Sequence, residues 1–323
     1  MGGLLDTAGE RLHVECSLPW VMELVAEGAA GELRQVHGAD GTLRVVVEAD
    51  RHAFDTRGWQ VLARGVWRRA HEIVIANACT AGFDLRLTHT PELAEFTFRW
   101  RPPRRERVAS RLLRSRFHLL ARAVLMQYPV LWWAGTRGRV PLHASAYGDG
   151  TSTPLLTAPS GVGRTTLVLA ELEAGAQATA DNLTVGDGTS VWSVVEPVRV
   201  EGGDGRRMPH GRQEAPLGQR ASCLVPDCLV VLERGLEQPS LATCSADAAV
   251  RALVTSTYMA GELRRYWSFA ATLAAGTGLG PPHPPITEVA TTFAGKLPCF
   301  SYALGRAPGA GLSALLDAAK VAA

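Results

Sequence analysis

Lysine is almost absent from this sequence. Lys296 and Lys320 are its two lysines, so arginine supplies the other 31 of the 33 basic residues. Together with abundant alanine and glycine, this bias is typical of a GC-rich genome, in which lysine codons are rare. An arginine at a position where related motifs carry lysine is therefore weak evidence of lost function in this chain.

Metal-binding cysteine patterns and long apolar runs are missing as well. The six cysteines include no C-x-x-C pair, and none lies beside a suitably spaced histidine, so we expect no structural zinc site. No stretch reaches the roughly 20 consecutive apolar residues that cross a membrane. The first 16 residues lack the basic start and apolar run of a secretory signal. We therefore expect reduced thiols, a cytoplasmic protein and no membrane partner.

Charge and length bound the remaining classes. The net charge of +2 on 323 residues is too small to indicate a nucleic-acid partner, and 46% hydrophobic residues are ordinary for a globular protein. The chain is long enough for two modest domains. Pro102 and Pro103 mark a boundary, which predicts an N-terminal α+β domain of unknown role in residues 1–103 and a second domain in residues 104–323.

Local patterns predict a mixture of helices and strands. Residues 43–49 and 96–100 are rich in β-branched and aromatic residues and are expected to be strands, whereas 55–78 are expected to be mostly helical. Residues 104–128 have helical periodicity and one arginine-rich face. That helix either binds a membrane surface or nucleic acid, or packs on the core with a solvated arginine face; we favour the second interpretation.

From residue 140 the pattern becomes strand, turn, strand, loop and helix, followed by more strands and, from residue 246, mostly helix. Residues 201–220 are polar and rich in glycine and proline, which predicts a mobile loop. Its Arg206, Arg207, His210 and Arg212 either close over a transferring phosphate or are merely solvated, and the solvated interpretation is favoured. Residues 258–269 either shape a peptide groove or place their aromatic residues in the core, and the core interpretation is favoured. Glu233 ends a strand and is a candidate to face the site.

The most informative stretch is the loop at residues 158–165, which reads APSGVGRT. It matches the phosphate-loop pattern G-x-x-x-x-G-K-[ST] except at Ala158 and Arg164. Gly161 and Gly163 let the backbone turn sharply so that N–H groups converge on an anion, and the following helix adds its positive N-terminal end. The hydroxyl of Thr165 is placed to bind Mg²⁺.

Three further residues lie at informative distances from this loop. Arg164 keeps the positive charge of the usual lysine and is expected to hold the β- and γ-phosphates. Asp181 follows 17 residues later, at the end of the next strand, where it can bind Mg²⁺ or take a proton from an acceptor hydroxyl. His143 precedes Ala158 by 15 residues; it is either an acid/base or pH-sensing group or a hydrogen-bonded core histidine, and the spacing favours the first.

The stretch from His143 to Asn182 resembles the catalytic core of the HPr kinase/phosphorylase family. The resemblance is stronger to its divergent members, which include kinases that modify ribosomally made peptides. It implies a phosphate-loop core with a mixed sheet, like that of phosphoenolpyruvate carboxykinase, together with ATP, Mg²⁺, a hydroxyl acceptor and a homo-oligomer. The residues expected to act are Asp181, Arg164 and His143 in catalysis, Ser160, Gly161, Val162, Gly163, Arg164, Thr165 and Thr166 with the nucleotide, and Thr165, Asp181 and Asn182 with the metal.

Two departures from the family pattern leave a second hypothesis open. Arg164 replaces the lysine, and Asn182 stands where the family has a second aspartate; an amide cannot serve as a base. The family's long glycine-rich segment has no convincing equivalent, which argues against HPr itself as the substrate and against phosphorylase activity. We therefore expect an ATP- and Mg²⁺-dependent kinase that phosphorylates a hydroxyl of a peptide, protein or small molecule. The alternative is a nucleotide-binding sensor or partner subunit of another enzyme.

Overall fold

The computed structural model describes residues 2–36, 41–202, 208, 212–235, 237–305 and 311–322. It is a mixed α/β protein whose chain forms two compact units. Unit 1 comprises Met1–Arg137, Val195–Pro216 and Arg265–His283, and unit 2 comprises Gly138–Val194, Leu217–Arg264 and Pro284–Ala323. Residues 104–137 thus belong with the N-terminal strands, although the sequence suggested a boundary after Pro103. Among the described residues, no helix is both long and apolar enough to cross a membrane.

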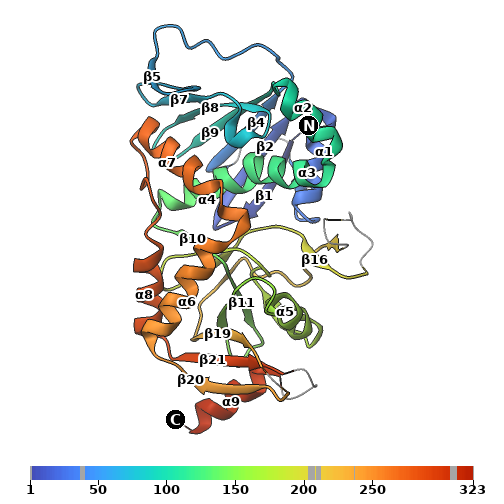
Figure 1. The fold of residues 1–323 in the computed structure, drawn as a ribbon, viewed down its shortest axis with the longest axis vertical. Coiled ribbons are helices and arrows are strands. Elements are labelled where there is room, and N and C mark those ends of the chain that lie inside the picture. Colours follow the sequence, from blue (N-terminus) through green and yellow to red (C-terminus); the bar gives the residue numbers. More distant parts are fainter. Residues whose placement is uncertain are drawn as a thin grey trace. The chain divides into compact units, whose positions relative to one another are not determined.

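Unit 1 is built on a nine-stranded sheet (Figure 1). From edge to edge its strands are β3 (Arg34–Gln35), β1 (Gly2–Thr7), β2 (Glu10–Cys16), β4 (Leu43–Glu48), β9 (Ala94–Trp100), β8 (Phe83–His89), β7 (Glu72–Ile75), β6 (Val66–Arg69) and β5 (Gln60–Ala63). β4 runs parallel to both β2 and β9, and the other neighbours are antiparallel. The predicted strands at 43–49 and 96–100 are confirmed as β4 and β9.

The two faces of this sheet differ in chemistry because side chains alternate along each strand. Leu85, Leu87 and Phe96 are fully buried. Phe96 contacts Trp132 of α4 (Tyr128–Gly135) and Phe269 of α7 (Tyr266–Thr277), with ring centroids 5.7 and 6.5 Å apart. Arg86, which lies between the two leucines, points to the other face, where ion pairs such as that with Glu72 run across the strands. The apolar face therefore forms the core of unit 1, and the polar face is available for other contacts.

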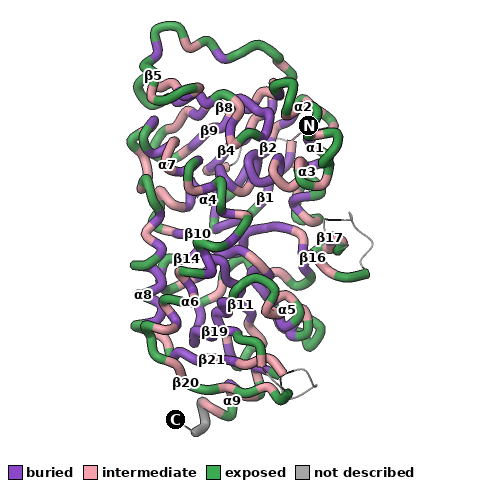
Figure 2. The backbone as a smooth tube through the Cα atoms, viewed as in Figure 1, coloured by how far each residue is buried: buried purple, intermediate pink, exposed green. Residues whose placement is uncertain are grey.

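The remaining elements of unit 1 include three helices and a short hairpin. They are α1 (Pro19–Gly28), the 3₁₀ turn η1 (Ala78–Thr80), α2 (Arg104–Leu112), α3 (Arg114–Arg122), the π-helical turn η2 (Ala123–Gln127), β16 (Val198–Val200) and β17 (Gln213–Ala215). The segment from α2 to α4 is the helix expected at 104–128, but it breaks at Leu113, whose φ is −114° and ψ 50°. Its apolar stripe is only partly buried, since Leu112 is 77% exposed whereas Val124 is fully buried. Figure 2 shows that α2 is largely exposed.

The helix expected over residues 55–78 is wrong. The chain there forms the short strands β5, β6 and β7, which pair as antiparallel neighbours. Gly58 and Gly65 adopt φ values of 75° and 77°, which suit tight turns and not a helix. Each of these strands is only four residues long, so equivalent residues of neighbouring strands follow one another closely in the sequence. The resulting distances between apolar and arginine residues resemble the three- or four-residue spacing of a helix.

Unit 2 contains a six-stranded mixed sheet and a four-stranded antiparallel sheet. The larger has the order β13 (Gln177–Ala178), β11 (Ala144–Gly148), β12 (Pro154–Thr157), β19 (Cys228–Arg234), β21 (Cys299–Leu304) and β20 (Ser240–Thr243), and the smaller has the order β10 (Val140–Leu142), β14 (Thr184–Gly186), β15 (Val191–Ser193) and β18 (Cys223–Leu224). β12, β19 and β21 are parallel to one another, so their carboxyl ends lie at one edge of the sheet.

Helices of unit 2 pack on these sheets (Figure 1). α5 (Arg164–Glu173) contacts β11 and β13, α6 (Ala246–Met259) contacts β12, β19 and β21, and α8 (Ile286–Lys296) lies along α6. The 3₁₀ turn η4 (Gly261–Leu263) follows α6, and α9 (Leu312–Ala322) contacts β20. The predicted turn, strand, loop and helix are confirmed as the connection after β11, β12, the β12–α5 loop and α5, but the single strand predicted from residue 140 is split into β10 and β11, which belong to different sheets.

Candidate functional site

The loop between β12 and α5 makes a sharp turn at two glycines before the helix begins. Gly161 and Gly163 adopt φ values of 81° and 127°, a region that side chains with a Cβ rarely occupy. Ala158, at the first position of the pattern, is buried at the end of β12. Gly163 is the N-cap of α5 and offers no side chain to its first turn. No N-cap side chain therefore accepts hydrogen bonds from the first amides of α5. An anion site at a helix N-terminus needs such amides to be free of a side-chain cap.

Thr165 and Asp181 lie side by side at this helix end. The Thr165 hydroxyl donates a hydrogen bond of 3.0 Å to Oδ2 of Asp181, and Asp181 is only 7% exposed. Asp181 arrives there because it follows β13, which pairs with β11, the neighbour of β12. The structure thus brings together a hydroxyl and a carboxylate, the two oxygen donors predicted as ligands of Mg²⁺.

Arg164 makes different contacts from those expected of a phosphate ligand. Its Nε donates to the carbonyl of Asp181 at 2.9 Å, and Nη1 donates to the carbonyl of His143 at 2.8 Å. Nη2 lies 2.9 Å from Nε2 of His143 and 3.2 Å from the carbonyl of Asn182. The side chain is buried. A forked guanidinium can donate to several acceptors at once, where an ammonium would reach fewer. Arg164 thus links the start of α5 to the backbone at His143 and at Asp181–Asn182.

His143 is a buried partner of Arg164. Burial and, next, the positive charge of Arg164 lower the pKa of His143 to about 4, so the ring is neutral at pH 7. The Nη2 group of Arg164 can only donate, and Oδ1 of Asn182, 3.1 Å from Nε2 of His143, can only accept, so these two contacts of Nε2 require opposite tautomers of the ring. The arrangement fits the hydrogen-bonded histidine of the two expectations, because proton uptake would bring two positive charges together.

Asn182 belongs to the group around Arg164 and His143 and not to the Thr165–Asp181 pair. Its Oδ1 lies 3.1 Å from Nε2 of His143 and 3.4 Å from Nη2 of Arg164. Its Nδ2 is buried and makes no hydrogen bond within the described residues. Of the three residues predicted to bind a metal, Thr165 and Asp181 are therefore in contact, and Asn182 faces Arg164 and His143.

Arg234 is a site residue that the sequence analysis missed. It ends β19, and its Nη2 donates a 2.7 Å hydrogen bond to the carbonyl of Gly161 in the loop. Its neighbour Glu233, which was considered for the site, is exposed at the same strand end. The available signal was position: β19 is parallel to β12, and Thr157 pairs with Val231, so a residue just beyond Val231 reaches the loop.

The other predicted residues have mixed outcomes. Ser160 and Thr166 are exposed, and Val162 is half-buried, in or next to the loop. Arg206, Arg207 and His210 lie outside the described residues, whereas Arg212 is described and exposed. In residues 258–269, Tyr266 and Phe269 are buried in unit 1, as the favoured core interpretation expects, whereas Tyr258 is exposed.

The protein side chains do not form a complete metal cage: within the described ranges, no three His, Cys, Asp or Glu side chains are grouped so as to hold a metal ion by themselves. Mg²⁺ in phosphate-transfer sites does not need such a cage, because it is held by one or two protein oxygens, substrate phosphates and water.

Compared with known proteins, the chain matches no protein-family model, and no curated protein is significantly similar to it.

Proposed function

We propose that unit 2 binds a nucleoside triphosphate with Mg²⁺ and transfers a phosphoryl group to a hydroxyl of a peptide, protein or small molecule. The observation that carries the proposal is the contact of Thr165 with Asp181 at the start of α5, directly after a loop with two left-handed glycines. A glycine loop that leads from a strand into a helix, with a hydroxyl and a carboxylate beside it, is the arrangement that binds phosphates and their Mg²⁺.

The residues at the loop fit a magnesium–nucleotide complex. Thr165 Oγ1 and Asp181 Oδ2 are two hard oxygen donors 3.0 Å apart, and they would hold Mg²⁺. When bound, the ion supplies positive charge that neutralises the phosphate oxygens. The amides of the loop and of the first turn of α5 bind phosphate oxygens. Asp181 also orients the acceptor hydroxyl or takes its proton, since it is the one carboxylate that contacts Thr165 among the described hydrogen bonds.

Arg164 and Arg234 have separate roles in this proposal. Arg164 is buried and positions Asp181 and Asn182 through their carbonyls, so it sets the geometry of the carboxylate. Arg234 is exposed at the loop, where it fixes the Gly161 carbonyl and adds positive charge close to the phosphates. Among the residues described here, Arg234 is thus better placed than Arg164 to respond to a bound phosphate group.

A second candidate, a nucleotide-binding sensor without turnover, is favoured by one specific observation. The guanidinium of Arg164 serves acceptors of the protein itself, and Asn182 supplies an amide where the resembling family has a carboxylate. Such a site has one carboxylate and lacks the loop lysine that would point at the phosphates. Its loop amides can still bind phosphate, but fewer groups are present to stabilise the transfer of a phosphoryl group. The two candidates share the binding step and differ in turnover.

Titration calorimetry with ATP and Mg²⁺, followed by a turnover assay for phosphate release or transfer, separates them. We expect Mg²⁺-dependent binding by the wild type that weakens about tenfold or more in Thr165→Ala, because a charge-assisted interaction is lost. Asp181→Asn abolishes turnover if the protein is a kinase. Asp187→Asn is the matched control, because Asp187 is exposed in a turn of the same unit, where it accepts hydrogen bonds from the amides of Thr189 and Ser190.

The outcomes are distinct. Turnover that survives in Asp187→Asn and disappears in Asp181→Asn supports the kinase. Tight binding by the wild type with no phosphate release, with hydroxyl-bearing peptides present or absent, supports the sensor. The absence of nucleotide binding by a folded wild-type protein would rule out both candidates.

A further inference from the structure

A cavity of about 420 Å³ lies in unit 1, far along the chain from the phosphate loop. Residues 51–59 lead from β4 towards β5, and Phe54 and Trp59 pack on Val74 of β7, with Trp67 beside them. The cavity is lined by this segment and by side chains of β6, β8 and β9. It therefore lies on the polar face of the nine-stranded sheet, since Val74 and Arg86 are register partners on that face.

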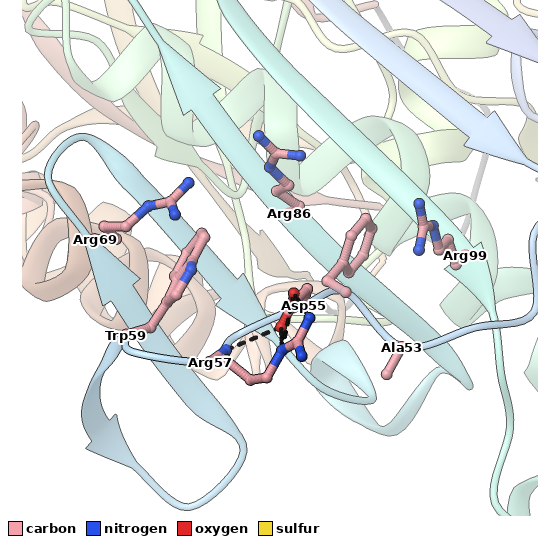
Figure 3. Close-up of a pocket in the computed structure, with 8 residues that line it drawn as sticks. Ala53, Asp55, Arg57, Trp59, Arg69, Arg86 and Arg99 are labelled. Atoms are coloured by element: carbon pink, nitrogen blue, oxygen red, sulfur yellow. Dashed lines mark hydrogen bonds and ion pairs between the residues drawn. The ribbon is translucent and has the colours of Figure 1, made fainter.

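Arginines dominate the lining of this cavity (Figure 3). Arg57, Arg69, Arg86 and Arg99 surround it, and Asp55 is the one acidic residue among the lining side chains. Guanidinium groups provide flat, forked sets of donors that match the oxygens of a phosphate or carboxylate. Each arginine can bind a ligand with those N–H donors that do not already contact a neighbouring carboxylate of the protein.

Two of the four arginines are already satisfied. Arg57 makes a close ion pair with Asp55 at 2.7 Å, and Figure 3 shows the two side chains against each other. Arg99 contacts two carboxylates, Glu48 at 2.6 Å and Asp50 at 3.0 Å. These residues shape the cavity, but they contribute little uncompensated charge.

The other two arginines share a single carboxylate. Arg86 lies 3.3 Å from Oε1 of Glu72, and Arg69 lies 3.5 Å from Oε2 of the same residue. Both contacts are longer than a good charge-assisted hydrogen bond. The Nε of Arg86 is buried and has no hydrogen-bond partner among the described residues. Asp55 also interacts electrostatically with Arg69, so the donor left without an acceptor is the Nε of Arg86, and a buried unpaired donor is costly until it is satisfied.

Aromatic rings hold two of the arginines in place. The guanidinium carbon of Arg69 lies 4.7 Å from the centre of the Trp59 ring, and that of Arg99 lies 4.2 Å from the centre of the Phe54 ring. Cation–π contacts of this kind restrict a long side chain without using its hydrogen-bond donors. The donors of Arg69 are thus positioned before any ligand arrives, which lowers the entropy cost of binding.

We propose that this cavity is a binding site for one oxyanion group, a phosphate or carboxylate, held between Arg69 and Arg86. The group supplies an acceptor for the Nε of Arg86 and a second partner, besides Glu72, for both guanidinium groups. It is carried either by a free small molecule or by the acidic side chain of a peptide, which present the same chemistry to the arginines. The proposal does not depend on nucleotide binding in unit 2.

Calorimetric titration of the full chain with three probes tests this site: inorganic phosphate, succinate and an acetylated, amidated triglutamate peptide. We expect at least one probe to bind, and its affinity to fall about tenfold or more in Arg69→Gln and in Arg86→Gln, because each loses a charge-assisted interaction. Arg34→Gln is the matched control; Arg34 is an exposed arginine on β3 that pairs with Asp6 away from the cavity.

Each outcome decides the proposal. Loss of binding in both cavity variants with unchanged binding in Arg34→Gln supports it, and the strongest probe identifies the source of the oxyanion. Binding that is equal in the wild type and both cavity variants overturns it, as does the failure of all three probes to bind folded wild type. The Arg69 side chain is 59% exposed, so Arg69→Gln is expected to fold even if Arg86→Gln does not. Binding at the phosphate loop is told apart by its insensitivity to both cavity variants.

Discussion

Nη2 of Arg164 lies 2.9 Å from Nε2 of His143, and the same guanidinium group donates to the backbone carbonyls of His143 and Asp181. The sequence predicts Arg164 to be a phosphate ligand. In the structure it acts instead as a clamp, meaning that its hydrogen bonds join the start of α5 to the backbone at two strand ends. Its replacement of lysine has a structural consequence: the charge is kept, but its hydrogen bonds are directed to the protein.

Arg164→Lys tests this clamp. A single ammonium cannot satisfy the acceptors that the fork now serves, so buried carbonyl groups are left without donors. We expect the free energy of unfolding, measured with urea, to fall by about 2 kcal/mol. Arg251→Lys, at an exposed position of α6, should change it by less than about 0.5 kcal/mol. A similar small change in both variants would show that Arg164 is not a clamp.

The neutral state of His143 predicts a pH dependence of stability. Its pKa is about 4 in the folded chain and about 6.5 when unfolded, so the unfolded chain binds more protons between these values. The stability that depends on neutral His143 is fully present above pH 6.5, and it is lost as the pH falls from 6.5 towards 4. Between pH 7.5 and pH 5.0 this amounts to about 2 kcal/mol.

Urea unfolding of the wild type and His143→Gln at these two pH values isolates the effect. Burial also lowers the pKa of His89, so other histidines contribute a slope in the same direction to both proteins. The wild type should therefore lose about 2 kcal/mol more than the variant on acidification. Equal losses in the two proteins would mean that His143 is not held neutral by Arg164 and burial.

Arg234 is predicted to act in nucleotide binding and not in folding. Its side chain is exposed, and its one described hydrogen bond goes to the Gly161 carbonyl. Arg234→Gln should weaken ATP binding about tenfold while it changes the unfolding free energy by less than about 0.5 kcal/mol. Arg234→Lys should restore part of the affinity, because the positive charge returns without the fork. Unchanged affinity in Arg234→Gln would remove this residue from the site.

Local patterns predicted the elements whose signals lie close together in the chain. The loop and α5 follow from two glycines and an apolar-periodic helix, and β4 and β9 follow from their β-branched and aromatic residues. Residues 55–78 were assigned to a helix because three very short strands carry no clear alternation of their own. Their pairing depends on turns at Gly58 and Gly65 and on β8, which lies beyond any local window.

The parts of the site that sequence could not supply depend on long-range pairing. Arg234 reaches the loop because β19 pairs in parallel with β12, although 73 residues separate Arg234 from Gly161. The inward direction of Arg164 is set by carbonyls at His143 and Asp181, which are 21 and 17 residues away. Spacing placed these residues in one region, but the choice of acceptors comes from the tertiary arrangement.

The two glycines Gly163 and Gly175 offer a matched pair for the last prediction. Both have strongly positive φ, 127° and 102°, and they precede and follow α5. A Cβ on Gly175 would meet open space, whereas one on Gly163 would lie 3.2 Å from Cδ1 of Leu304. Alanine at either position should lower the unfolding free energy by about 1–3 kcal/mol through backbone strain. Gly163→Ala should also abolish ATP binding, measured by calorimetry below the unfolding temperature, because the loop amides move with this residue. Gly175→Ala should bind ATP like the wild type, since it lies at the other end of the helix. If both folded variants bind ATP equally well, the glycine loop does not form the nucleotide site.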